Sequence, residues 1–131
     1  MKVLALDYGS ARTGVAVSDP TGAVARPLEV VQGAASESGL ARIVELVREH
    51  DAERVVVGLP LTMRGERGEQ AVETEKFVAL LRSALEVPVE SFDERFTTKL
   101  ADASDAKAEQ DSVAAAHLLT SYLTWKSARP A

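Results

Sequence analysis

Residues 3–18 have the sequence VLALDYGSARTGVAVS, two apolar runs joined by a polar connection that ends in glycine. Both runs are short and rich in aliphatic residues, which is typical of buried β-strands. A turn signal at residues 19–22, DPTG, follows the second run. The second strand and a third strand, from about Ala23 to Val31, should therefore form a hairpin. Pro27 is a point at which that third strand can be interrupted.

The rest of the chain alternates between helical and strand patterns. The predicted elements are a helix over 36–50 with Ser36 as its N-cap, a strand over 54–58, a loop over 61–69, a helix over 70–85, a strand over 87–92 and a helix over 113–125. Right-handed crossovers would make the fourth and fifth strands parallel to the first. We therefore expect one domain over residues 1–131. Its fold class is α/β, with a five-stranded mixed sheet of order 3-2-1-4-5, the second strand antiparallel, flanked by helices.

Composition excludes several classes of protein. The chain has 131 residues, 46% hydrophobic and 27% charged, a globular balance. There is no apolar run of about eighteen residues and no secretory signal, since an acid follows the first four apolar residues. We therefore expect a cytoplasmic protein with no membrane association. Cysteine is absent, which excludes disulfides, thiolate zinc sites and thiol nucleophiles. The net charge of −5 argues against a non-specific nucleic-acid binder, but an enzyme that contacts few phosphates can be acidic.

The first candidate acid is Asp7, which comes directly after the first strand. It opens the pattern Asp-x-Gly-x4-Gly that ends at Gly14. Gly9 lets the chain turn away beside the acid, so that Asp7 can face a hydrated cation or a phosphate. The alternative is an ordinary turn, because Asp and Gly are the commonest turn residues.

Two further acids, Asp93 and Glu94, follow the fifth strand. Adjacent side chains of a strand point to opposite faces, so only one of them is expected to face a site, and the spacing does not decide which. Arg95 could hold a carboxylate in place or contact a phosphate with its bidentate fork. The alternative is a solvated junction between a strand and a helix.

The fourth acid, Asp111, is expected to open the last helix. Its neighbours on one helical face are Ala115, Leu118 and Tyr122, an apolar stripe that should face the sheet and turn Asp111 toward the protein. A buried carboxylate is costly unless it is paired or bound to metal. The alternative is that Asp111 is the N-cap of that helix.

These acids should meet at one edge of the sheet, because the first and fifth strands both end there. If the fourth strand lies between the first and the fifth, those two strands are about 9.6 Å apart. Gly58, at the end of the fourth strand, has no side chain to fill the gap between them. Such a gap suits two divalent ions about 4 Å apart. Oxygen ligands without cysteine favour Mg²⁺ or Mn²⁺ over zinc. The pattern therefore predicts metal-assisted phosphodiester hydrolysis.

Four motifs in order resemble the YqgF (RuvX) family over nearly the whole chain. They are Asp7-Tyr8-Gly9 with Arg12 and residues 14–19, residues 57–61 with Met63 and Gly65, residues 93–98, and Asp111 with Ala114, Ala115 and residues 121–123. Members have the ribonuclease H-like fold and are described as candidate pre-16S rRNA processing nucleases and, earlier, as candidate Holliday junction resolvases. One departure is the segment 99–111, which is shorter and less basic here than in the family.

The resemblance implies specific roles for residues of this chain. Asp7, one or both of Asp93 and Glu94, and Asp111 would be the catalytic, metal-binding acids. The residues expected to hold the substrate are Arg12, Arg64, Arg67, Arg95, Thr97 and Thr98. The implied reaction is 5′-end processing of pre-16S rRNA with Mg²⁺ or Mn²⁺, by a monomer or a homodimer.

Three other functions remain open from the sequence. A resolvase would act on branched DNA in place of RNA. A nucleotide-binding ATPase is suggested by Asp-x-Gly-x4-Gly, which also resembles a phosphate loop of the actin and sugar-kinase superfamily, although those proteins enclose the nucleotide with two domains. A non-catalytic module would keep the fold and bind RNA or a transcription factor. Binding that survives simultaneous neutralisation of Asp7 and Asp111, with no cleavage by the parent, would favour that module.

Overall fold

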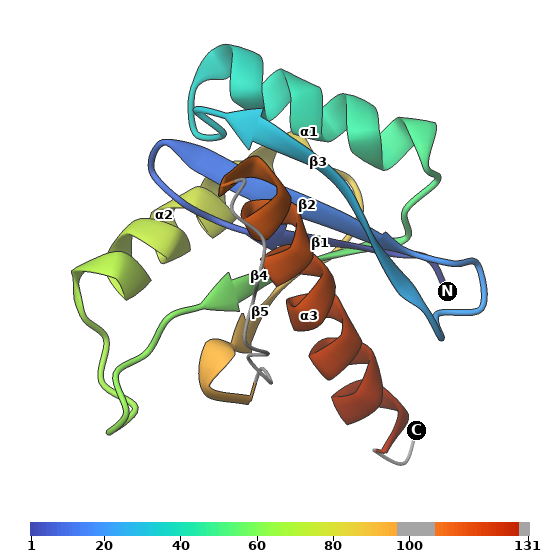
Figure 1. The fold of residues 1–131 in the computed structure, drawn as a ribbon. Coiled ribbons are helices and arrows are strands. Elements are labelled where there is room, and N and C mark those ends of the chain that lie inside the picture. Colours follow the sequence, from blue (N-terminus) through green and yellow to red (C-terminus); the bar gives the residue numbers. More distant parts are fainter. Residues whose placement is uncertain (97–106, 129–131) are drawn as a thin grey trace.

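A computed structural model describes residues 1–96 and 107–128, without the side chains of 107–110. The described elements are β1 (Val3–Asp7), β2 (Arg12–Ser18), β3 (Ala25–Gln32), α1 (Glu37–Glu49), β4 (Arg54–Leu59), α2 (Glu69–Ala84), β5 (Val89–Asp93), the 3₁₀ turn η1 (Glu94–Phe96) and α3 (Lys107–Ser127), as Figure 1 shows. Ser36 caps α1 as predicted, since its hydroxyl accepts a hydrogen bond from the Gly39 amide. A membrane-spanning length of apolar helix is absent from the described residues.

The strands form one sheet of order β3-β2-β1-β4-β5, which confirms the predicted order. β1 pairs antiparallel with β2 and parallel with β4, and β5 is parallel to β4. β2 and β3 form the predicted hairpin, and its register shifts between Val15 and Ala16, whose partners are Glu29 and Pro27. This irregularity lies at the predicted interruption, because proline cannot donate to the ladder. The carboxyl ends of β1, β4 and β5 consequently lie along one edge.

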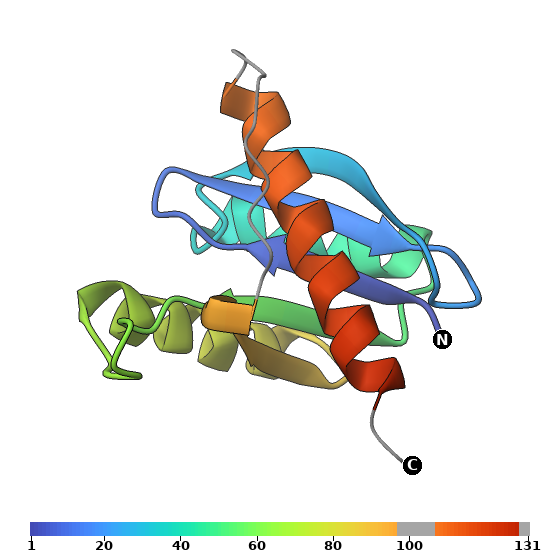
Figure 2. The same cartoon turned by 60° about the horizontal axis from the view of Figure 1, so that its bottom comes forward.

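Helices cover both faces of the sheet. α1 and α2 enclose one apolar cluster with Leu4, Leu6 and Val57, and α3 crosses the opposite face, where it packs on Val3, Ala5 and other residues (Figures 1 and 2). Side chains alternate along a strand, so the odd-numbered residues of β1 face α3. Asp7 therefore ends β1 on the α3 face of the sheet.

The last helix begins earlier than the sequence pattern predicted. We expected a helix over 113–125 with Asp111 at its opening, whereas α3 begins at Lys107. Residues 107–110, KAEQ, are strong helix formers, so the helix extends beyond its apolar stripe. Asp111 thus lies in the second turn, and the N-cap alternative was wrong. The predicted sheet-facing stripe is confirmed, since Ala115, Leu118 and Tyr122 are buried.

Candidate active site

Glycines occupy the strand positions on both sides of Asp7. On β2, the cross-strand partner of Asp7 is Gly14. On β4, Gly58 follows Val57, which is the partner of Leu6. Both glycines fall on the α3 face, as Asp7 does, because each is two residues from a strand residue packed under α3, Ala16 or Val56. No side chain from either neighbouring position therefore stands beside the Asp7 carboxylate.

Glu94 fills the space above Gly58. A Cβ built on Gly58 would lie 2.6 Å from Oε1 of Glu94, so the Glu94 carboxylate rests directly over the end of β4. Asp7 and Glu94 line the same cavity of about 350 Å³, together with the Tyr8–Ser10 turn and Pro60. Of the two adjacent acids between which the sequence does not decide, Glu94 is the one that lines a cavity with Asp7.

Asp93 points the other way and is engaged by Arg95. The Arg95 guanidinium donates to both carboxylate oxygens, with Nε to Oδ1 at 3.1 Å and Nη2 to Oδ2 at 2.6 Å. These hydrogen bonds lower the pKa of Asp93, whose side chain is only 17% exposed. Nη1 of Arg95 also lies 3.5 Å from the Met63 carbonyl oxygen, and the guanidinium packs against Gly65. The pair therefore braces the end of β5 against the loop between β4 and α2.

Asp111 reaches the site from α3, across Gly14. A Cβ at Gly14 would overlap the backbone carbonyl of Asp111, so the absence of a side chain lets α3 contact β2 here. Oδ2 of Asp111 lies 3.1 Å from Nε of Arg12, which begins β2. This contact is an ion pair without hydrogen-bond alignment, and Oδ2 is a buried atom that lacks a hydrogen-bond partner. Gly14 pairs with Asp7 across the β1–β2 ladder. The backbone of Asp111 therefore lies over the strand position next to Asp7.

The donors at this edge are chemically suited to a hard divalent cation. Asp7, Glu94 and Asp111 offer carboxylate oxygens, the ligands that Mg²⁺ and Mn²⁺ prefer, and Asp111 brings a buried oxygen without a hydrogen bond. Because Gly58 has no side chain, the Glu94 carboxylate can lie over the strand at this position. Among the residues that the structure describes, no three Asp, Glu or His side chains gather closely enough to hold one ion together. The Asp111 carboxylate is directed to Arg12 here.

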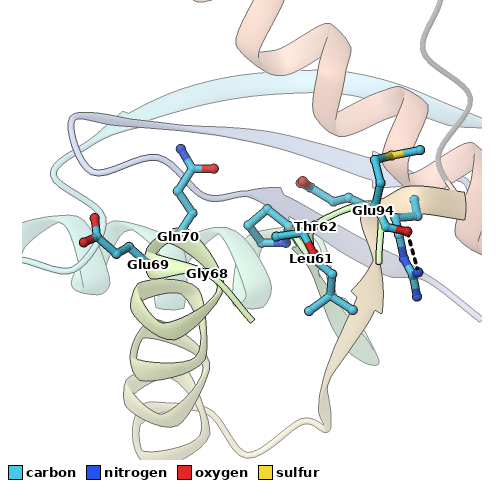
Figure 3. A pocket seen from close by; sticks show the side chains of 9 residues that line it. Leu61, Thr62, Gly68, Glu69, Gln70 and Glu94 are labelled. Carbon is cyan, nitrogen blue, oxygen red and sulfur yellow. Dashed lines mark hydrogen bonds between the residues drawn. The ribbon is translucent and has the colours of Figure 1, made fainter. Parts of the chain in front are cut away.

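A second hollow of about 760 Å³ adjoins the first. Figure 3 shows its walls, with Glu69 and Gln70 of α2 on one side and Glu94 on the other. Met63, on the loop that borders the hollow, is 89% exposed. No sequence pattern marks Met63, Glu69, Gln70 or Glu73 as site residues. A topological signal existed: a crossover helix that follows β4 must begin at the edge where β4 ends.

The remaining predicted substrate contacts lie on the same loop or beyond the described ranges. Arg67 forms an ion pair with Glu75, Nη2 to Oε1 at 2.6 Å, and Arg64 is exposed beside Met63. Thr97 and Thr98 lie outside the described residues. Of the six predicted contacts, Arg12, Arg64, Arg67 and Arg95 are described, and Arg12, Arg67 and Arg95 already have carboxylate partners.

Comparison with known proteins gives these residues a context. The profile of a family described as "RuvX: Holliday junction resolvase" matches residues 1–125. A protein of Chloroflexus aurantiacus named "Putative pre-16S rRNA nuclease" is 45% identical, over 98% of this chain and 90% of its own length. A relative of the same name from Syntrophomonas wolfei is 37% identical, over 94% of both chains.

Among solved structures, RuvC of T. thermophilus in complex with a Holliday junction substrate has the same fold. Its TM-score is 0.59, with 20% sequence identity, over 98% of this chain and 96% of that chain. This likeness establishes a ribonuclease H-like fold, which the resemblance had implied. From the profile match and the identity to its curated relatives, this chain belongs to the RuvX family of nucleases.

Proposed function

We propose that this chain is a divalent-metal-dependent nuclease that hydrolyses phosphodiester bonds of structured RNA, with the 5′ end of pre-16S rRNA as its substrate. The names of the curated relatives support the substrate. The observation that carries the proposal is the placement of Asp7 and Glu94 on one cavity at the carboxyl edge of the sheet. Asp7 lies at the carboxyl end of β1, and the Glu94 carboxylate rests over Gly58 near the end of β4.

In this proposal Asp7 and Glu94 hold Mg²⁺ or Mn²⁺ from β1 and from the end of β5, and Asp111 is the third ligand, from α3. Held there, two such ions would supply activation of a water molecule and charge stabilisation of the leaving oxygen of a phosphodiester. Asp93 is a positioning residue, because it holds Arg95 and through Arg95 the loop at Met63. Arg64 and Arg67, both exposed on that loop, would then contact the RNA backbone.

The test is cleavage of a labelled RNA that spans the 5′ end of mature 16S rRNA, with Mn²⁺ or Mg²⁺ added. The parent should cut it, and Asp7→Asn, which keeps the size of the side chain and removes its charge, should not. A four-way DNA junction of matched length serves as the second substrate, since the matching family profile is described as a Holliday junction resolvase. Faster cleavage of the junction would replace RNA by branched DNA, and full activity of Asp7→Asn would refute the site.

A further inference from the structure

The ion pair between Arg12 and Asp111 is placed where it bears on the proposed metal site. Arg12 and Gly14 lie on the same face of β2, so the Arg12 side chain is aimed at α3. Nε of Arg12 lies 3.1 Å from Oδ2 of Asp111, and the two side chains are 33% and 30% exposed. Arg12 thus supplies the positive charge that this carboxylate needs, at the same edge as Asp7.

A guanidinium and a divalent cation compete for binding to one carboxylate. Both are positively charged, and their mutual repulsion is strong in a partly buried position. The Nε–Oδ2 contact also lacks hydrogen-bond alignment, and Oδ2 has no hydrogen-bond partner among the described residues, so this ion pair is not reinforced by an aligned hydrogen bond. A hard cation offers a carboxylate oxygen a direct ligand bond. Exchange of Arg12 for the cation is therefore physically reasonable.

We propose that Arg12 is a built-in counter-ion of Asp111 that a divalent cation displaces, and that the displaced guanidinium then contacts a phosphate of the substrate. This rests on the proposed function, since it takes Asp111 as a metal ligand. Arg12 follows directly on the turn after Asp7, and a third of its side chain is exposed, so it has solvent to move into. Its planar fork matches a phosphate, and in the structure its Nε lies against the Asp111 carboxylate.

The experiment measures Mn²⁺ affinity by calorimetry for the parent, Arg12→Gln, Asp111→Asn and the double variant. Arg12→Gln should bind Mn²⁺ more tightly, by about two- to fivefold, since the cation no longer competes with a partly exposed ion pair. In the Asp111→Asn background the same substitution should have a clearly smaller effect, because the shared partner is gone. Arg26→Gln removes the same charge from β3, about 17 Å along the sheet from Arg12, and should leave Mn²⁺ affinity unchanged.

RNA affinity gives a second, independent readout. With Ca²⁺ present to prevent turnover, Arg12→Gln should weaken binding of an RNA hairpin, and in EDTA it should not, because Arg12 is then held by Asp111. Arg12→Lys keeps the charge without the fork, so it should restore the parent's Mn²⁺ affinity but not its RNA affinity.

Several results would overturn the exchange. Weaker Mn²⁺ binding by Arg12→Gln would do so, as would an equal gain in both Asp111 backgrounds or a loss of RNA affinity that is the same with and without Ca²⁺. Failure of the proposed function is distinguishable: Mn²⁺ affinity would then be unchanged by Asp7→Asn in the parent, and both proposals would fall together.

Discussion

Gly58 and Gly14 determine where the acids of this site can lie. The strand pattern of the sequence does not itself require glycine at either position. In the structure, the space over each glycine is filled by another residue. At Gly58 the occupant is the end of a flexible side chain, Glu94, whereas at Gly14 it is the backbone of Asp111. The same substitution is therefore expected to have different consequences at the two positions.

Gly58→Ala should reduce activity while leaving the fold intact. The new Cβ would fall 2.6 Å from Oε1 of Glu94, and the carboxylate can move aside only by leaving its place over β4. A misplacement of about 1 Å at a catalytic group can cost about 100-fold in rate. We expect a loss of at least tenfold in RNA cleavage, by the order of magnitude of that effect. Thermal unfolding should be nearly unchanged, and a large loss of stability would contradict the placement.

Neutralisation of Glu94 and of Asp93 should reduce activity by different amounts. Glu94→Gln is expected to reduce cleavage by about 100-fold or more. A loss of about 100-fold is the upper end of what is seen when a residue that only supports a metal ligand is mutated. Asp93→Asn keeps Glu94 in place and removes the partner of Arg95, so its loss should be the smaller one. Rates on the same RNA under saturating Mn²⁺ compare the two. If Asp93→Asn were the more damaging substitution, Asp93 and not Glu94 would be the ligand.

The sequence predicted that only one of these two acids would face the site, but it could not identify which. Strand alternation fixes that neighbours oppose each other, and it predicts nothing about the point where β5 ends and η1 begins. The turn of η1 carries Glu94 over β4, and that depends on tertiary packing. The absence of a side chain at Gly58 was visible in the sequence, and the structure shows what fills the space.

At the level of elements, the contact of α3 with β2 is the tightest constraint at the site. Gly14→Ala would drive a Cβ into the Asp111 carbonyl, so helix and sheet must separate. We expect a loss of about 1–3 kcal/mol or more in the free energy of unfolding, as for overpacked cores. Urea unfolding followed by circular dichroism measures it.

Gly68→Ala is the matched control for Gly14→Ala. A Cβ at Gly68 would meet no atom within 4 Å, and its φ of −84° suits alanine. The cost of a poorer N-cap and the gain from a less flexible unfolded chain should nearly cancel, to within about 0.5 kcal/mol. Equal losses at both glycines would mean that the contact with α3 is not the cause.

A second link between elements joins α1 to β3. The Arg42 guanidinium donates to both oxygens of Glu29, with Nη2 to Oε1 at 2.7 Å, and these hydrogen bonds lower the pKa of Glu29. A carboxyl whose pKa is lower in the folded state than in the unfolded state stabilises the fold at any pH above its unfolded-state pKa. That contribution is lost as the pH falls through the folded-state pKa.

The parent should therefore be more stable than Glu29→Gln at pH 7, by a small amount because both side chains are about a third exposed. The difference should hold down to about pH 4.5, the ordinary pKa of the glutamate, and disappear below it as Glu29 protonates. Thermal unfolding of both proteins between pH 3 and 7 tests this. A difference that grew on acidification would have the wrong sign.

For the whole molecule, strand order was predictable because two crossovers of fixed hand leave few ways to extend a three-stranded meander. The start of α3 was not, since apolar periodicity marks only the part of a helix that touches the sheet. Residues 107–110 precede the apolar stripe in the sequence, and their intrinsic propensity extends the helix. The pairing of Arg12 with Asp111 was likewise not predictable, because it depends on how closely α3 approaches β2.

The charge of the molecule makes a final prediction about RNA binding. Binding affinity falls with salt by a logarithmic slope of about −0.9 for each phosphate neutralised on duplex DNA, and less on single strands. The net charge is −5, and three of the four candidate arginines already contact carboxylates. We therefore expect a slope no steeper than about −3.6, the value for four phosphate contacts.

The slope is measured with an RNA hairpin at a fixed Ca²⁺ concentration and varied KCl. Arg64→Gln, which removes an exposed arginine of the loop, should make it shallower by about 0.9 at most, whereas Arg26→Gln should not change it. A slope much steeper than −4 would require several more cationic contacts than the candidate edge provides. The RNA would then lie on a different surface of the protein, and Arg64→Gln would leave the salt dependence as it is.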